Sequence, residues 1–171
     1  MALGDELITL SNVRQYRDVD TQYDPVRFSA FLKEVQEHDL KELLGDALWL
    51  NFFENITDIN YATLLNGVEY TYNNQTILYS GLKPFLVWAW LAKLPLEGNL
   101  HHTQSGDVSY LRDITASPSK SVMNQALENY KQNKLVERNK IIQFLNTNPN
   151  TYPLWESDYQ QNTTNLQFDI I

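Results

Sequence analysis

A ten-residue run that is apolar on almost every side constrains this chain more than any other feature. Residues 85–94 read FLVWAWLAKL, and only Lys93 among them is charged. Pro84 directly precedes the run and suits the first turn of a helix, where its missing N–H leaves no hydrogen bond unmade. A helix without a polar face has to be buried by other parts of the fold or assembly. The sequence therefore predicts a buried helix over this run.

A helix stop and a β-hairpin are expected just before the buried helix. Gly67 is typical of the position that follows a helix C-terminus. Two short stretches then alternate in polarity on either side of Asn73-Asn74, a pair that tolerates the positive φ angles of a tight turn. Their alternating residues are Val68, Tyr70 and Tyr72 before the turn and Ile77 and Tyr79 after it. Gly81 is expected to end the second strand.

Helical periodicity continues on the N-terminal side. Asp24-Pro25 provides an N-cap and a proline at the first helical position. Apolar residues follow at the i, i+3, i+4 and i+7 positions of one helical face, namely Phe28, Phe31, Leu32 and Val35. We expect this helix to end at His38-Asp39, where His38 suits the C-terminal end of the helix dipole. Residues 1–23 are expected to form an extended or short helical segment that leads into the domain.

Two more helices are expected between that helix and the hairpin. The first runs from Leu40 to Phe52, with Gly45 as a weak point or a kink. The second is short, is capped by Thr57 or Asp58, and reaches Leu65.

The C-terminal half combines a long excursion with a long helix. Residues 95–118 contain two prolines and two glycines, which predicts a long loop with one short strand near Val108–Leu111. A helical stripe of roughly 28 residues follows a serine cap at Ser117 or Ser119. Asn148-Pro149 should stop this helix, and the sequence Tyr-Pro-Leu-Trp at 152–155 is typical of an anchor.

The last residues carry a second apolar pattern. Leu166, Phe168 and Ile170 alternate with polar residues, and Ile171 follows them. An alternating segment of this kind favours a partner strand or a groove.

Composition limits the class of protein. The 171 residues suit one domain, and we expect a single, mainly α domain over 1–171, a small helical bundle with a β-hairpin and an inserted β-containing loop. Residues 1–23 would be its entry and 156–171 its tail. A net charge of −8 argues against a phosphate-gripping surface. The absence of cysteine excludes disulfides and thiolate chemistry. No signal peptide or bilayer-spanning run is predicted, which indicates a soluble protein without a membrane partner.

Motifs for catalysis are weak. His101 and His102 are adjacent and would diverge on a strand or helix, and no metal-ligand spacing completes them. The acidic pairs Glu34/Glu37 and Asp18/Asp20 could serve glycoside hydrolysis only with a cleft around them, and their patterns favour solvated faces. No nucleophile motif or phosphate loop is present. We therefore predict no enzymatic activity, no metal and no cofactor.

Aromatic residues offer a different hypothesis. Trp88 and Trp90 would point about 200° apart on a helix, so both cannot face one core, and one is expected to meet a neighbouring subunit. Alternatively, Trp88 or Trp90 and the loop Leu96–Pro118 could hold a ligand, which would make the chain a soluble helical module that binds a peptide or carbohydrate.

Several segments follow one another in a recognisable order over about residues 24–155. They are the Asp24-Pro25-capped helix, residues 43–48 (LLGDAL), residues 64–70 (LLNGVEY), residues 79–83 (YSGLK) with the apolar helix, the loop around residues 105–108 (SGDV), the long helix, and residues 152–155 (YPLW). This order resembles that of the head-to-tail adaptor (head completion, or connector ring) proteins of tailed bacteriophages. It is most similar to the ring proteins of crAss-like phages of Bacteroidetes. The resemblance lies in a pattern of elements and includes no catalytic signature.

The resemblance implies a structural virion protein that forms a ring, usually of twelve copies, below the portal. Such a ring would extend the DNA channel, join the capsid to the tail, and contact the portal and other ring or tail proteins. DNA would pass through the channel without specific binding. The location implied is the head-tail connector of the virion, with the host cytoplasm during assembly.

The same resemblance implies regional roles. Leu96–Pro118 would engage neighbouring subunits, and Asn162–Ile171 would reach the portal. The candidate residues for portal or subunit interaction are Trp88, Trp90, Val108, Tyr110, Leu111, Leu166, Phe168, Ile170 and Ile171.

Overall fold

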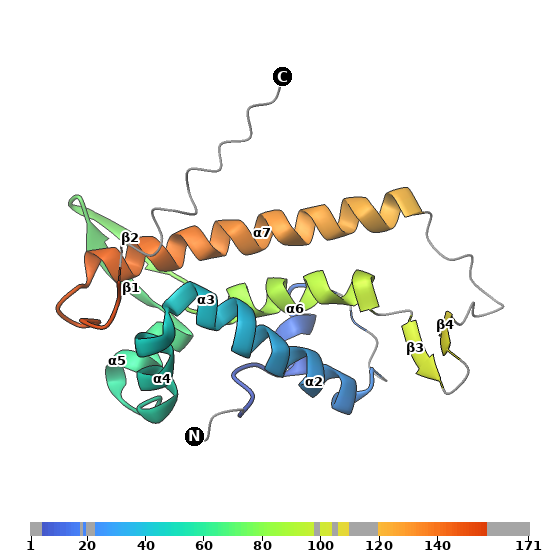
Figure 1. The fold of residues 1–171 in the computed structure, drawn as a ribbon. Coiled ribbons are helices and arrows are strands. Elements are labelled where there is room, and N and C mark those ends of the chain that lie inside the picture. The colour runs from blue at the N-terminus through green and yellow to red at the C-terminus, as the bar shows by residue number, and fades with distance from the viewer. Residues whose placement is uncertain are drawn as a thin grey trace.

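The fold is mainly helical with a β-hairpin, as predicted, and a second antiparallel hairpin precedes the last helix (Figure 1). The structure, a computed structural model, describes residues 5–17, 19, 23–97, 100–103, 106–109 and 120–156. Its helices are α1 (Leu10–Arg14), α2 (Pro25–Val35), the π-helical turn η1 (Gln36–Leu40), α3 (Lys41–Leu44), α4 (Asp46–Glu54), α5 (Ile59–Asn66), α6 (Lys83–Glu97) and α7 (Lys120–Thr147). Its strands are β1 (Val68–Tyr72), β2 (Gln75–Tyr79), β3 (Leu100–Thr103) and β4 (Gly106–Ser109).

Helix α6 is the buried helix that the apolar run predicts. It lies between α7 on one side and the α2–η1 helix on the other, and α1 also packs against it (Figure 1). Its most buried side chains are 2% exposed or less, and they are Phe85, Leu86, Val87, Ala89, Trp90 and Leu91. At about 25 cal/mol per Å² of apolar surface removed from water, this helix is a major source of folding free energy.

The helix that starts at the Asp24 cap does not end at His38-Asp39, so that expectation is wrong. It passes through η1 and continues as α3 to Leu44, because Leu40, Leu43 and Leu44 all bury their side chains in the same core. His38 is consequently an exposed residue within a π-helical turn rather than at a helix end.

Gln36 anchors the π-helical turn. Its side chain, 1% exposed, accepts a hydrogen bond from the Leu7 N–H at 2.9 Å and donates one to the Asp5 carbonyl at 3.0 Å. Its own carbonyl accepts a hydrogen bond from Trp49 Nε1 at 2.9 Å. The buried amide thus joins the N-terminal segment to η1, and the Gln36 carbonyl joins η1 to α4.

Gly45 separates α3 from α4 as a sharp kink. Its φ angle is +75°, a conformation that costs an L-residue with a side chain about 1–2 kcal/mol. Asp58 then caps α5, accepting a hydrogen bond from the Asn60 N–H at 2.8 Å.

The β1–β2 hairpin turns at Asn73-Asn74, as predicted. Tyr72 pairs with Gln75 across the turn, where Asn73 and Asn74 have φ angles of +50° and +60°. Two glycines with positive φ, Gly67 and Gly81, bring the two ends of the hairpin together. A Cβ on Gly67 would lie 2.3 Å from the Tyr79 carbonyl oxygen, so the two backbones touch at the hairpin base.

Aromatic rings tie this base to the C-terminal end of α7. Tyr79 stacks on Phe144 with centroids 4.0 Å apart, and Tyr70 meets the same ring edge-on at 5.3 Å. Tyr152 lies 5.8 Å from Phe144 and donates a hydrogen bond to the Asn60 carbonyl at 2.8 Å. Trp155 donates to Asn146 Oδ1 at 2.8 Å. Residues 152–155 are therefore the anchor that the sequence predicts.

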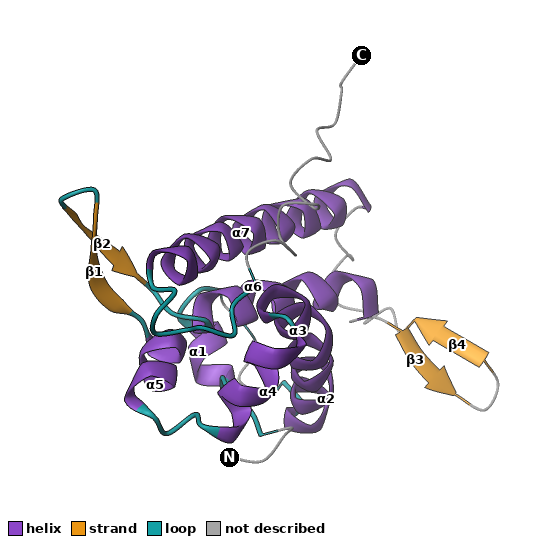
Figure 2. Cartoon of the chain, turned by 60° about the vertical axis from the view of Figure 1, so that its left-hand side comes forward, coloured by secondary structure: helices purple, strands orange, loops and turns teal. Residues whose placement is uncertain are grey.

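Helix α7 has the predicted length of 28 residues. The excursion before it differs from expectation, because it contains two paired strands rather than one. Leu100–Thr103 pairs antiparallel with Gly106–Ser109. The two hairpins lie at opposite ends of the helical body (Figure 2). None of the described helices is both long and apolar enough to cross a membrane.

Gly81→Ala should destabilise the protein much more than Gly45→Ala. Both glycines have positive φ angles, +84° and +75°, but a Cβ at Gly81 would lie 2.4 Å from the Leu65 carbonyl oxygen, whereas Gly45 has nothing within 4 Å. We expect Gly45→Ala to cost about 1–2 kcal/mol from its backbone conformation alone. Gly81→Ala should cost about 3 kcal/mol or more, because the backbone clash adds to that term. Urea unfolding measures both, and equal losses would contradict the described contact.

Tyr152→Phe should reduce the alkaline sensitivity of the fold. Burial, with smaller effects of Tyr61 and Asp58, raises the pKa of Tyr152 from 10.0 to about 12. The folded protein thus favours the neutral hydroxyl, and this stabilisation is complete below pH 10 and is lost as the pH rises through 12. At pH 7 the free energy of unfolding of the variant should be about 1 kcal/mol lower, because the hydrogen bond to the Asn60 carbonyl is lost. Above pH 10 its stability should fall less steeply with pH than that of the unmodified protein.

Denaturant unfolding at pH 7 to 12 tests this expectation. Tyr72→Phe, which changes an exposed tyrosine near the hairpin turn, is the matched control and should keep the slope of the unmodified protein. An unchanged slope in Tyr152→Phe would overturn the role given to this hydroxyl.

Candidate functional site

The two adjacent histidines lie in the second hairpin. His101 pairs with Val108 of β4, and His102 pairs with Asp107. Across the ranges that the structure describes, no three His, Cys, Asp or Glu residues are placed to hold a metal ion.

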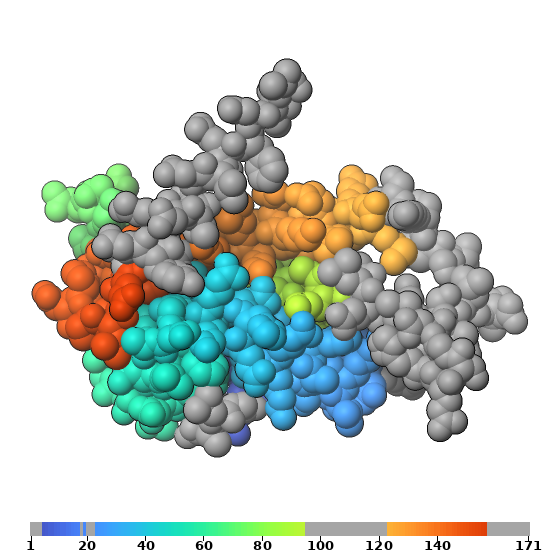
Figure 3. Space-filling view, in the orientation of Figure 1, coloured from blue at the N-terminus to red at the C-terminus, as the bar shows by residue number. Residues whose placement is uncertain are grey.

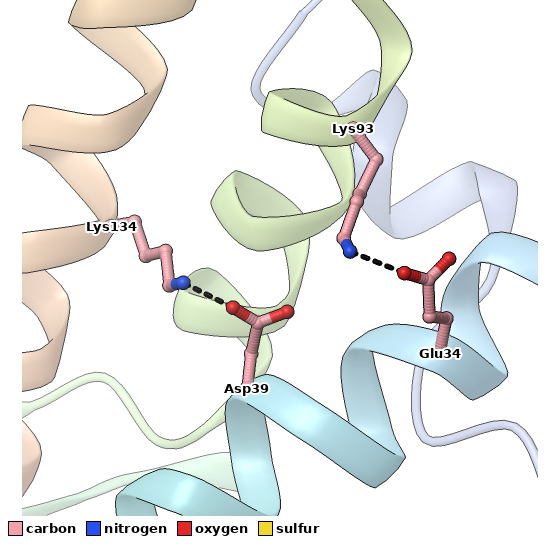
Figure 4. Close-up of polar contacts among 4 residues, drawn as sticks. All are labelled: Glu34, Asp39, Lys93 and Lys134. Carbon is pink, nitrogen blue, oxygen red and sulfur yellow. Dashed lines mark hydrogen bonds and ion pairs between the residues drawn. The ribbon is translucent and has the colours of Figure 1, made fainter. Parts of the chain in front are cut away.

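Of the acidic residues singled out in the sequence, Glu34 takes part in an ion pair between helices, and Asp39 forms a second such pair. Glu34 of α2 accepts a hydrogen bond from Lys93 of α6 at 2.5 Å, and Asp39 of η1 pairs with Lys134 of α7 (Figure 4). Glu37 is exposed and does not join Glu34. Both ion pairs are partly buried, and they connect the central helix and α7 to the α2–η1 helix. Asp18 and Asp20 lie outside the described residues.

Trp90 is a core residue, so its assignment to an interface is wrong. It is 0% exposed, its ring lies 5.2 Å from Phe28 and 5.4 Å from Tyr23, and its Nε1 donates to the Phe28 carbonyl at 3.3 Å. A neighbouring subunit cannot contact it.

Trp88 also finds its partners within the chain. It is half-buried and lies 5.7 Å from Tyr16 and 6.1 Å from Tyr130, with the Arg17 guanidinium 5.4 Å above its ring. The argument that Trp88 and Trp90 cannot share one core fails because α6 is enclosed. α2 covers one side of this helix, and α1 and α7 cover the side that carries Trp88.

The other predicted contact residues remain predictions. Val108 lies in β4, opposite His101. Tyr110 and Leu111 lie outside the described residues, as do Leu166, Phe168, Ile170 and Ile171 in the tail.

A groove that sequence analysis missed lies between the α3–α4 corner and the C-terminal anchor. Its volume is about 880 Å³, and it is lined by Glu37, His38, Lys41, Glu42, Leu44, Gly45, Asp46, Ala47, Trp49, Leu154, Trp155 and Glu156. Its apolar floor includes the indoles of Trp49 and Trp155, and its rim carries four acidic residues. The anchor is the red segment that lies beside the teal helices (Figure 3). The anchor was visible in the sequence, but its approach to Gly45 depends on tertiary packing.

A smaller hollow of about 360 Å³ lies between α3 and α7. Leu43, Phe85 and Leu135 contribute its apolar lining, and its rim carries both signs of charge, from Asp39, Glu42, Lys131, Lys134 and Arg138. Asp39 already pairs with Lys134. The hollow is therefore a gap between packed helices whose lining charges include both signs, and it does not concentrate charge of one sign.

The β1–β2 hairpin carries three exposed apolar side chains. Leu78 is 68% exposed, Tyr72 39% and Val68 38%. In the space-filling view the pale green hairpin stands out from the helical body (Figure 3). Its base is fixed by the Gly67–Gly81 contact and by Phe144. We call the strands β1 and β2 with their exposed side chains the hairpin surface.

The most strongly perturbed hydroxyl is that of Tyr79, whose pKa is raised well above 10.0, chiefly by burial. It donates to the Leu64 carbonyl at 2.9 Å, which uses it to hold α5 to the hairpin base. The groove and the hairpin surface, by contrast, present apolar side chains to the outside.

Comparison with known proteins gives one finding. Neither the curated proteins nor the solved structures contain a match to this chain. A family of unknown function, DUF6712, matches residues 40–165, a range that begins at the last residue of η1 and covers the hairpin, the central helix and α7. With most of its length matched, the chain belongs to the DUF6712 family.

Proposed function

We propose that this protein is a structural subunit of a phage head-to-tail adaptor ring, which docks on the portal, extends the DNA channel and joins capsid to tail. Its work would be assembly, without catalysis, metal or cofactor. The other ring or tail proteins would be its further partners.

The observation that carries this proposal is the arrangement of a firm helical body with a hairpin at each end (Figure 2). Helix α6 is enclosed, and the pairs Glu34–Lys93 and Asp39–Lys134 connect the helices around it. Segments that project from both ends of a rigid body can contact a neighbour on each side, as a ring subunit must.

The segments that carry the resemblance lie where helices and strands of the fold meet. Residues 43–48 form the turn at Gly45 between α3 and α4, and residues 64–70 and 79–83 meet at the hairpin base. Residues 152–155 anchor the end of α7. The resemblance therefore concerns positions that set the architecture, which is the property that a ring subunit shares with others of its kind.

Charge and exposed apolar surface agree with the proposal. A net charge of −8 would repel phosphates and let DNA slide through a channel. The exposed side chains of Leu78, Ile59 and Val26 are 68%, 75% and 75% accessible, and heterologous contacts in a closed ring are a means of covering such surface.

One observation favours a second function. The large groove beside Trp49 and Trp155 has an apolar floor and a polar rim, which is the usual make-up of a ligand site. A monomeric module that binds a peptide in this groove is the alternative. Sequence analysis placed the ligand of such a module at Trp88 or Trp90. Since Trp90 is buried and Trp88 is packed against Tyr130, the groove is the better candidate for the binding site.

Mass measurement separates the two functions. Native mass spectrometry or light scattering would be applied to the full chain alone and mixed with portal particles of a crAss-like phage. We expect a closed oligomer, or stoichiometric capture by the portal, which would be twelve copies of the 19.9 kDa chain if the family pattern holds. A monomer that does not bind portals at any tested concentration would overturn the adaptor function and favour the peptide-binding module.

A further inference from the structure

The edges of the β1–β2 hairpin lack the usual protection against pairing with another chain. Proteins commonly guard exposed strand edges with lysine, proline or inward charges. The two strands read VEYTY and QTILY, and Glu69 is their one charged residue. Over the described residues, β1 and β2 pair only with each other. Both outer edges therefore present backbone N–H and C=O groups that a further strand could use.

The hairpin surface is also incomplete as a sheet. A two-stranded hairpin is at best marginally stable by itself in water. Here, Tyr79 is buried against Phe144, but Tyr72 beside the turn is 39% exposed, and Leu78, on the opposite face of the hairpin, is 68% exposed. Because the Gly67–Gly81 contact fixes the base, the hairpin offers its open edges in a fixed orientation. A preorganised edge binds an added strand at lower entropic cost.

The same sequence contains a segment with the matching pattern. In residues 165–171, Leu166, Phe168 and Ile170 alternate with Gln167 and Asp169. A strand of this kind places its apolar residues on one face and its polar residues on the other. Side chains 68, 70, 72, 77 and 79 share one face of the hairpin, and the register leaves Thr71 and Thr76 on the opposite face.

We propose that residues 165–171 of one copy add as a third strand to the β1–β2 hairpin of a neighbouring copy. Backbone hydrogen bonds would give affinity, and Leu166, Phe168 and Ile170 would extend the face of Tyr70 and Ile77, as in other cases of strand addition. The tail would thus serve a neighbouring subunit, in place of the portal contact that the resemblance implies.

The choice of a second copy rests on the proposed ring. Both halves of the interaction are present in this one sequence, so no further protein is needed to complete it. Tail-to-hairpin contact is heterologous, since the two copies use different surfaces, and repeated heterologous contacts form a ring when the rotation between copies closes. The ten residues from Glu156 to Leu166 span up to about 33 Å when extended, so the chain has length beyond its anchor with which to contact another copy.

Engineered disulfides provide a direct test, because the protein has no cysteine. One full-length chain would carry Thr76→Cys or Thr71→Cys on the hairpin, and a second, affinity-tagged chain would carry Gln167→Cys in the tail. Added strands place facing side chains close enough for a disulfide, whose Cβ atoms lie about 3.5–4.5 Å apart. The matched control replaces the hairpin cysteine by Glu54→Cys, an exposed position at the end of α4.

We expect mild oxidation of the mixed chains to give an intermolecular disulfide with at least one hairpin position, at a yield at least tenfold above the Glu54→Cys control. Adding Leu166→Ser, Phe168→Ser and Ile170→Ser to the tail chain should lower the yield to that of the control. Equal yields at hairpin and control positions would overturn the proposal. A further chain would carry both a hairpin cysteine and Gln167→Cys. A disulfide that forms only within this chain, and not between chains, would also overturn the proposal, since the tail would then occupy its own hairpin.

Portal capture, measured in parallel on the unmodified chain, keeps the two proposals apart. If the chain binds portal particles but no hairpin-selective disulfide forms, the strand addition is wrong and the adaptor function is still supported. If a hairpin-selective disulfide forms but the chain does not bind portal particles, the strand addition is supported as a self-assembly contact and the adaptor function is contradicted.

Discussion

Enclosure of the apolar helix α6 is the constraint on which the rest of the structure depends. Its side chains from Phe85 to Leu91 are almost all excluded from water, so elements on several sides have to reach it. Helix α2 supplies Phe28 against Trp90, and α7 lies along another side of the helix. Polar contacts then join the covering elements, with Lys93 and Lys134 pairing to acids of the α2–η1 helix.

Local sequence signals were sufficient to predict helix starts and turns, because there a particular residue type meets the needs of the nearby backbone. Asp24 and Asp58 cap their helices as predicted, because the side-chain oxygen and the amides it serves lie within two or three residues. Asn73-Asn74 and Gly81 take the positive φ angles that their turns demand. Belonging to the family adds no function to this outline, so the adaptor role stands as a proposal built on element order and architecture.

Features that depend on tertiary packing were not predictable in the same way. The helix passes through His38 because buried leucines lie beyond it, and no local rule signals that continuation. One of Trp88 and Trp90 was expected to meet a neighbouring subunit, yet Tyr130 and Arg17 from distant parts of the chain contact Trp88. The groove beside Trp155 forms from two segments about a hundred residues apart, and β3 was missed since its His-His-Thr sequence lacks apolar alternation.

The stack of Tyr79 on Phe144 has a mechanical consequence. It couples the base of one hairpin to the C-terminal end of α7, while the N-terminal end of that helix follows the excursion that holds the other hairpin. At 1.5 Å per residue, the 28 residues of α7 make a strut of about 42 Å. A pull on the β1–β2 hairpin would therefore pass through the Tyr79–Phe144 stack to α7, and from α7 to the central helix α6 that it packs against.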